Sequence, residues 1–223
     1  MSEWGGSGGS VPLASAEPVA RSPIEPPPPV LVVEGWEVSG RRARAGLTLT
    51  DCTPLAKVGV RAPIGGRAAA ELAVPFGRAV RGPGGTLVAG SGPGEWLLLA
   101  APGQGPALAA RMSDLAARCP GELVTATDVT HGRALVRLTG PRAADVLAKV
   151  CGIDLSEGIT PDGAAFRTAL AAVATDVIRD DTGGVPSYLL HCERSSGAYL
   201  FGELLAAGGE FGIEIDGFTT EGI

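Results

Sequence analysis

The chain has 223 residues, 45% of them hydrophobic, and a formal net charge of −6. This length suits one domain with attached segments and can bury a core without disulfides or metals. The acidic balance excludes a general nucleic-acid binder, because neutralising phosphates requires a surplus of Lys and Arg. No apolar run approaches the roughly 18 residues that span a bilayer, and the four cysteines are scattered. We therefore expect a cytoplasmic protein with free thiols and no membrane partner.

The first 29 residues differ in composition from the rest of the chain. They open with a Gly/Ser-rich stretch and end in four consecutive prolines. Such a segment buries too little apolar surface to offset the loss of chain entropy on folding. The sequence therefore predicts a disordered head at 1–29 and a linker at 30–46. The ordered domain is expected at 47–217, followed by a tail at 218–223.

From residue 94 onward, the hydrophobic periodicity alternates between that of strands and that of helices. On the first predicted helix, Leu108, Met112 and Leu115 recur at intervals of four and three. The denser glycines at 82–94 predict a loop. Strands are expected at 94–100, 123–129, 134–138, 168–179, 187–192 and 211–215, and helices at 106–119, 141–151 and 195–207.

The order of these elements is β-α-β-β-α-β-β-α-β. Two hairpins interrupt the alternation, which disfavours a doubly wound parallel sheet. An interlocked pair of split β-α-β units fits the order. The sequence therefore predicts an α+β fold with antiparallel-rich sheets and helices packed on one face.

Short-spaced catalytic and metal-binding motifs are absent from the sequence. It contains no CxxC, HExxH or GxSxG pattern. His191 and Cys192 are neighbours on a predicted strand, where adjacent side chains point to opposite faces. The same alternation favours a solvated hairpin end for Asp180 and Asp181. We expect no metal site and no catalytic residue, although a Cys–His couple brought together by the fold stays open.

One glycine-rich turn resembles a dinucleotide-binding fingerprint. Gly103 and Gly105 follow a predicted strand and precede a predicted helix. Leu108 stands where the third glycine would allow close packing of helix and strand. The next strand also enters a hairpin instead of a crossover helix. We therefore expect no nicotinamide or flavin on this chain.

The corner at 128–133 has the densest group of functional side chains in the sequence. Asp128, His131 and Arg133 lie within six residues at a predicted strand–turn–strand junction. Such a corner could orient a ligand with amide or carboxylate groups. Alternatively, Asp128 accepts hydrogen bonds from the turn backbone and Arg133 is solvated. The residues alone favour the second interpretation.

Residues 128–155 resemble the signature of the folate-binding aminomethyltransferase superfamily, which has the fold of the glycine-cleavage T protein. The shared pattern is Asp-x-Thr, a strand, Gly-Pro-x-Ala at a helix start, an apolar helix and a following Asp. More narrowly, the stretches at 94–98, 180–181, 188–190 and 194–195 resemble the gamma subunits of heterotetrameric sarcosine oxidases. The resemblance extends over about 47–215.

This resemblance implies interlocked ferredoxin-like plaits, as in the N-terminal region of the T protein. It also implies a non-catalytic gamma subunit with alpha, beta and delta partners. That complex demethylates sarcosine oxidatively to glycine, passes the one-carbon unit to tetrahydrofolate and releases hydrogen peroxide. FAD, FMN, NAD and tetrahydrofolate would lie on the other subunits, with no cofactor on this chain.

An alternative from another class stays open. The chain could be a free-standing small folate-binding or aminomethyltransferase-like protein. In either case the resemblance makes Asp128, His131 and Arg133 the candidates for a vestigial folate pocket. The chain lacks the length expected for the C-terminal barrel of full transferases, which favours the subunit over the free-standing protein.

Overall fold

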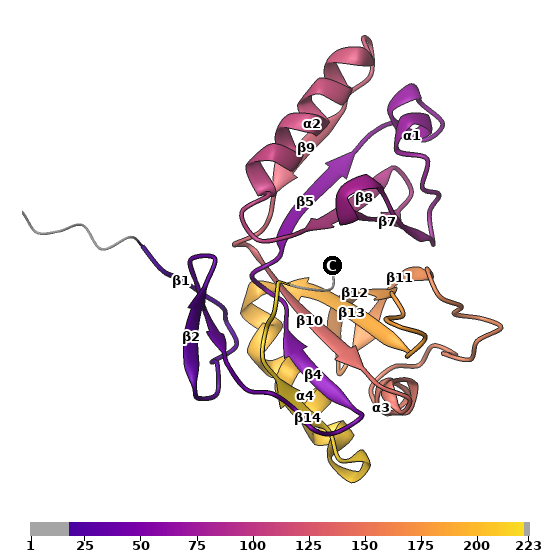
Figure 1. Ribbon diagram of the computed structural model, residues 1–223. Coiled ribbons are helices and arrows are strands. Elements are labelled where there is room, and N and C mark those ends of the chain that lie inside the picture. The colour runs from indigo at the N-terminus through magenta and orange to yellow at the C-terminus, as the bar shows by residue number, and fades with distance from the viewer. Residues whose placement is uncertain (1–17, 221–223) are drawn as a thin grey trace, which may run out of the picture.

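The computed structural model describes residues 18–220 and consists of two large sheets, a small sheet and flanking helices (Figure 1). The expected mixed α+β class is confirmed. None of the described helices is long and apolar enough to cross a membrane. Short 3-10 turns complete the described elements: η1 (Pro83–Gly85), η2 (Arg194–Ser196) and η3 (Gly209–Phe211).

The largest sheet has the strand order β11-β12-β13-β10-β4-β14. Its neighbouring strands are antiparallel except for the parallel pair of β4 and β14. Two helices, α3 (Ala143–Ala148) and α4 (Gly197–Gly208), cover one face. The strands are β4 (Thr48–Asp51), β10 (Arg133–Thr139), β11 (Ala165–Leu170), β12 (Val173–Arg179), β13 (Ser187–Glu193) and β14 (Glu214–Asp216).

An apolar core fills the space between this sheet and its helices. Leu147 of α3 and Leu204 of α4 are fully buried against Val136 and Leu138 of β10. Gly140 lets the chain turn sharply from β10 toward α3. Its φ of +144° is closed to other residues, and a Cβ there would lie 2.4 Å from the Gly46 carbonyl oxygen.

The second sheet has the antiparallel order β6-β7-β8-β5-β9. Helix α2 (Gly105–Arg118) packs on its outer face through Leu108, Met112 and Leu115, which confirms the helix expected at 106–119. Helix α1 (Arg67–Leu72) lies on the same core. The strands are β5 (Ala56–Arg61), β6 (Ala79–Arg81), β7 (Leu87–Gly92), β8 (Glu95–Ala100) and β9 (Thr125–Asp128).

The helix-free faces of the two sheets form a second core between them. Leu97 and Leu99 of β8 and Leu135 of β10 belong to this inter-sheet core, together with Leu189 of β13. Phe218 is also buried here, although the sequence placed it in the tail. Each large sheet therefore has helices on one face and the other sheet on the opposite face.

The expected disorder at 1–29 and linker at 30–46 are wrong for the described part of these segments. Residues 18–46 form a small sheet of order β1-β3-β2, with Trp36 and Val38 buried. Ile24 anchors the Pro-rich segment in the core of the six-stranded sheet. Residues 1–17 lie outside the described residues. The strands are β1 (Ala20–Arg21), β2 (Val30–Val33) and β3 (Trp36–Ser39).

Hydrogen bonds explain why the proline run is ordered. Prolines carry no N–H, but their carbonyl oxygens accept bonds. The Pro29 oxygen accepts from the Gly40 backbone N–H at 2.7 Å, and the Pro27 oxygen accepts from the Ser39 hydroxyl at 2.8 Å. The backbone of the run is therefore satisfied by the neighbouring hairpin, which composition alone did not show.

Two further expectations are corrected. The single strand expected at 168–179 is two strands, β11 and β12, joined at Ala171 and Ala172. Both alanines have positive φ, +45° and +66°, and neither is a residue type that signals such a turn. The loop expected at 82–94 contains β7.

Candidate functional site

A cleft of about 540 Å³ opens at one end of the space between the two large sheets. One wall comes from β5, β8 and β9, and the other from β10 to β13. The cleft has a mixed polar and apolar lining and adjoins the apolar inter-sheet core. Its ionisable side chains are Arg61, Glu95, Arg133, Arg167, Asp176, His191 and Glu193.

A row of three side chains crosses the wall formed by β11, β12 and β13. Arg167 donates to Asp176 at 2.6 Å, and the Nδ1 atom of His191 lies 3.1 Å from the other Asp176 oxygen. Burial raises the pKa of Asp176, but the hydrogen bonds from His191 and Arg167 outweigh it and hold that pKa below its ordinary value. Burial lowers the pKa of His191. The pair is therefore a carboxylate beside a neutral imidazole at neutral pH.

The remaining charges of the cleft are paired across strands. Arg61 lies 3.0 Å from Glu95, and Arg133 lies 2.5 Å from Glu193. Both pairs face each other in the register of adjacent antiparallel strands. The cleft thus carries guanidinium groups and carboxylates in equal number.

The fold gives the three candidate residues of the corner at 128–133 different surroundings. One Asp128 oxygen accepts from the Thr130 backbone N–H at 2.8 Å, which is the turn interpretation of this residue. His131 stacks on Trp36 with ring centroids 4.8 Å apart and planes 8° apart, so it holds the small sheet. Of the three candidates, only Arg133 lines the cleft.

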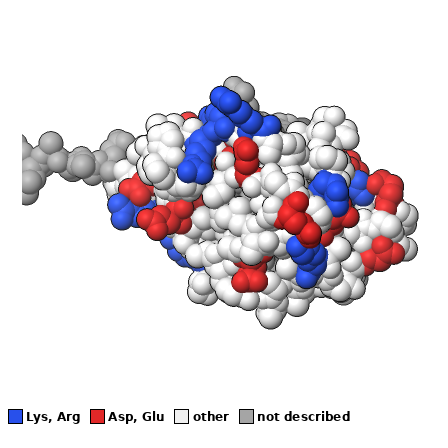
Figure 2. All heavy atoms as spheres, turned by 90° about the horizontal axis from the view of Figure 1, so that it is seen from below, with Lys and Arg blue, Asp and Glu red and all other residues white. Residues whose placement is uncertain are grey.

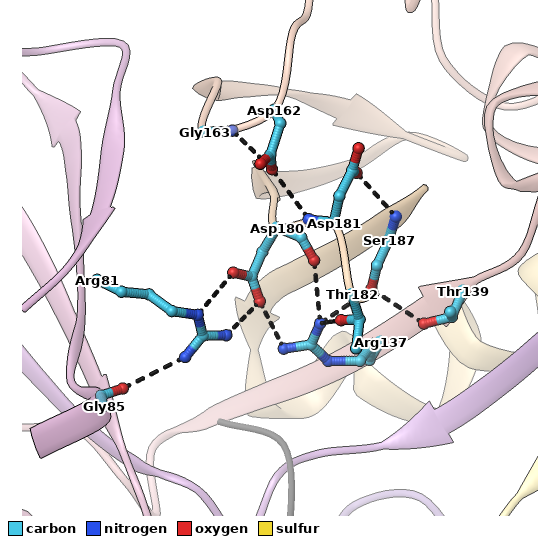
Figure 3. A network of polar contacts seen from close by, with 10 residues as sticks. All are labelled: Arg81, Gly85, Arg137, Thr139, Asp162, Gly163, Asp180, Asp181, Thr182 and Ser187. Carbon is cyan, nitrogen blue, oxygen red and sulfur yellow. Dashed lines mark hydrogen bonds and ion pairs between the residues drawn. The ribbon is translucent and has the colours of Figure 1, made fainter. Parts of the chain in front are cut away.

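Asp180 and Asp181 lie at the hairpin end between β12 and β13 as expected, but the expectation that they are solvated is wrong (Figure 3). Asp180 is 8% exposed and accepts hydrogen bonds from Arg81 at 2.6 Å and from Arg137 at 2.8 Å. Asp181 pairs with Arg179. Because Arg81 belongs to β6 and Arg137 to β10, Asp180 joins the two large sheets.

A buried lysine was missed by the sequence reasoning. Lys57 on β5 is fully buried, and its ammonium nitrogen donates to the Thr53 and Leu55 carbonyl oxygens at 2.7 Å each. Burial lowers its pKa to about 7. The available signal was a lysine between Ala56 and Val58 in a mostly apolar stretch, where periodicity treats it as an interruption of the pattern.

The cysteines do not provide a reactive thiol. All four are free and buried. Burial raises the pKa of Cys52 and of Cys192 to about 11, so both thiols are protonated at neutral pH. Within residues 18–220, no group of three or more His, Cys, Asp or Glu side chains is placed to hold a metal ion.

The fold and this arrangement of sheets define a known class of domain. The family model of the GCVT N-terminal domain matches residues 86–222. The chain therefore belongs to the GCVT N-terminal domain family, and the resemblance seen in residues 128–155 is confirmed.

Within that class, the chain is a homologue of one particular subunit. It is 32% identical over 149 residues to sarcosine oxidase subunit gamma from Corynebacterium sp. (strain U-96), a match that covers 63% of this chain and 69% of that protein. The heterotetrameric sarcosine oxidase from Corynebacterium sp. U-96, solved in complex with pyrrole 2-carboxylate, contains a chain with a TM-score of 0.63 and 29% identity. That match covers 78% of this chain and 88% of the other.

A more distant structure supports the fold alone. The glycine cleavage system aminomethyltransferase T from Bartonella henselae gives a TM-score of 0.61 at 17% identity. The match covers 84% of this chain and 55% of the transferase.

Proposed function

We propose that this chain is the gamma subunit of a sarcosine oxidase-like heterotetramer, with alpha, beta and delta subunits as its partners. The observation that carries the proposal is the match in sequence to a gamma subunit, together with the match in structure to a chain of a heterotetrameric sarcosine oxidase. The match extends over most of that subunit, so it concerns the whole domain and no isolated motif.

The complex demethylates sarcosine to glycine, reduces oxygen to hydrogen peroxide and passes the one-carbon unit to tetrahydrofolate. FAD, FMN, NAD and tetrahydrofolate belong to the other subunits, and the complex acts in the cytoplasm. This chain contributes to assembly and no catalytic residue. In support, Asp128 is engaged in a turn and His131 in a stack with Trp36.

The N-terminus of α2 also fits a dinucleotide poorly. A Cβ on Gly105 would lie 2.5 Å from an Asp128 carboxylate oxygen. The carboxylate therefore sits against the first turn of α2, where the pyrophosphate of a bound dinucleotide would need the backbone N–H groups. Two anionic groups would repel each other at this position.

The fine architecture belongs to the same proposal. We infer that the two large sheets and their helices are interlocked ferredoxin-like plaits. The chain order supports this inference. The elements β8, α2 and β9 of the five-stranded sheet are followed directly by β10 and α3 of the six-stranded sheet.

An assembly subunit needs surfaces for its partners, and β2 offers one. Val30, Leu31 and Val32 are 49%, 47% and 61% exposed, and β2 is an edge strand of the small sheet. Exposed apolar edge strands pair readily with other chains. On the face shown in Figure 2, a short band of basic side chains and scattered charges of both signs lie among large uncharged areas. A partner subunit that covers β2 would remove its apolar surface from water.

The test is co-purification of the tagged full chain from native extract, followed by mass spectrometry of the bound proteins. We expect the alpha, beta and delta subunits to co-purify. The isolated chain should show no flavin absorbance and no sarcosine oxidation. Stoichiometric flavin on the isolated chain, or micromolar binding of tetrahydrofolate without partners, would contradict the proposal and favour the free-standing folate-binding protein.

A further inference from the structure

The strand β14 lies at one edge of the six-stranded sheet and pairs with β4 on its inner side. Glu214 donates its backbone N–H to the Leu47 carbonyl oxygen at 3.1 Å on that side. Because successive residues of a strand direct their backbone groups to opposite sides, the N–H and carbonyl of Ile215 point away from β4. Unpaired backbone groups at a sheet edge are a template for another strand. The outer side of β14 can therefore accept one.

A hollow of about 530 Å³ lies beside residues 213–215. Leu205 of α4 lines it, as do Arg41 and Arg42 from the segment that connects β3 to β4. Ile213 and Ile215 also line it and are only partly buried. The outer edge of β14 thus adjoins a space that combines apolar side chains with guanidinium groups.

The guanidinium groups of the connecting segment have no carboxylate partner. Arg41, Arg42 and Arg44 are exposed, and within residues 18–220 none of them forms an ion pair. Arg41 donates to the Pro28 carbonyl oxygen at 3.2 Å. Arg42 donates to the carbonyl oxygen of Arg41 at 2.7 Å. One contact each holds these two groups in place and leaves most of the five N–H donors of an arginine unused.

Two carboxylates of β14 bind the backbone of the same segment. Glu214 accepts from the N–H groups of Arg44 and Ala45 at 2.8 and 3.3 Å, and these hydrogen bonds hold its pKa below the ordinary value. Asp216 accepts from the N–H of Ala43 at 2.9 Å. The carboxylates therefore fix the segment in place, and its three arginines leave a surplus of positive charge in a chain of net charge −6.

The hollow also adjoins the small sheet. Pro28, which accepts from Arg41, lies two residues before the start of β2 at Val30. The neighbouring Pro29 accepts from the backbone N–H of Gly40, the residue before Arg41. The basic segment and the exposed apolar strand β2 therefore meet at one end of the small sheet, where a single partner can cover both.

We propose that an extended acidic segment of a partner subunit adds to β14 as a further strand. Its backbone pairs with Ile215, and its carboxylates bind Arg41 and Arg42. An apolar side chain of the segment lies against Leu205. Charge complementarity selects such a segment over a basic one, and the apolar lining selects it over a polyphosphate. The inference rests on the proposed function, since it requires partner subunits, and it adds which edge of this chain they bind.

Hydrogen exchange measured by mass spectrometry tests the strand addition. In the isolated full chain, the backbone N–H of Ile215 should exchange quickly, because it faces solvent. In the complex with the alpha, beta and delta subunits, it should exchange about tenfold or more slowly. The exposed segment around Leu123 is the control and should exchange equally in both states. An Ile215 N–H that stays unprotected in the assembled complex would overturn the proposal.

Arg42→Glu tests the role of charge. It should raise about tenfold the concentration of this chain that gives half-maximal assembly, because it sets a carboxylate against carboxylates. Arg111→Glu, the same change at an exposed arginine of α2 with no ion pair among the described residues, should leave that concentration unchanged. Arg42→Gln should act in the same direction with a smaller effect, and it keeps the test decisive if Arg42→Glu does not fold.

A photo-reactive side chain at Ala43, which lines the hollow, identifies the bound segment. In the complex it should label a carboxylate-rich stretch of one partner subunit. Replacing the labelled carboxylate by lysine should restore assembly of Arg42→Glu. A label on a stretch without carboxylates, or on a second copy of this chain, would overturn the inference. A complex that forms equally well with Arg42→Glu would overturn this inference alone, whereas a wild-type chain that retains no partner subunit would overturn the proposed function as well.

Discussion

The two faces of the six-stranded sheet bury very different surfaces. Under α3 and α4, the core is apolar throughout, with residues such as Leu147 and Leu204 fully buried. On the opposite face, Leu135 and Leu189 share the space between the sheets with the buried polar residues Asp180 and His191. The first face holds the domain together by removing apolar area from water. The second face carries paired charges and borders the cleft, where a ligand could bind.

This comparison predicts two kinds of response to substitution. Changes on the helix-covered face should reduce stability without breaking an ion pair, because that core is built from hydrophobic side chains. Changes between the sheets should alter ion pairs, pH dependence or ligand binding. The variants below are ordered by the size of the expected effect.

Leu147→Asp should unfold the domain. It places an unpaired carboxylate in a fully apolar core, at a cost of roughly 3–5 kcal/mol or more against a total stability of about 5–15 kcal/mol. Circular dichroism and urea denaturation would measure the loss. The matched control is Ala148→Asp at the exposed last residue of α3, which should cost only about 1 kcal/mol through lower helix propensity and a negative charge at the helix C-terminus. Equal effects of the two variants would contradict the packing described for α3.

Asp180→Asn should destabilise the protein by about 2–3 kcal/mol, because Arg81 and Arg137 lose their shared carboxylate. Chemical denaturation at neutral pH would measure this difference. Asp114→Asn, at an exposed position of α2, is the control and should lie within about 0.5 kcal/mol of the wild type. A neutral Asp180→Asn would show that the two sheets are held by apolar contacts alone.

Lys57→Met should remove a pH dependence of stability. The folded pKa of Lys57 is about 7, below the ordinary lysine value of 10.5. Between these values the unfolded chain binds more protons than the folded one, so wild-type stability rises with pH through this window. The free energy of unfolding, measured from pH 7 to pH 10, should rise less steeply in Lys57→Met. Lys149→Met, the same change at a surface lysine, should keep the wild-type slope.

Val32→Glu should have the smallest effect on stability, within about 0.5 kcal/mol, because the side chain is 61% exposed. Its effect on the proposed assembly should be large, since it places a charge on the apolar edge of β2. Pull-down yield of the partner subunits would measure it. Leu123→Glu, at an 80% exposed position before β9, is the control for a new surface carboxylate. Undiminished assembly of Val32→Glu would exclude β2 from the interface.

The same contrast explains which features could be predicted from the sequence. The helix-covered faces follow from periodicity: Leu108, Met112 and Leu115 on α2, and Val146 and Leu147 on α3, are buried as expected. These buried positions could be predicted because each helix packs a single apolar stripe against one sheet.

The inter-sheet face could not be predicted in the same way. Asp180 and His191 owe their surroundings to strands distant in the chain, such as the one that carries Arg81. The turn at Ala171 and Ala172 carried no glycine or proline signal. The fold class and family could thus be inferred from the sequence. The cleft could not, because it forms only where the two large sheets pack against each other.

The most direct test of the central claim is native mass spectrometry of this chain co-expressed with the alpha, beta and delta subunits of its complex. The account predicts one dominant species whose mass equals the sum of four different chains, with this chain present once. It also predicts that omitting this chain prevents the complex from forming at full yield. A three-chain complex that forms equally well and leaves this chain free in solution would contradict the assignment as its gamma subunit.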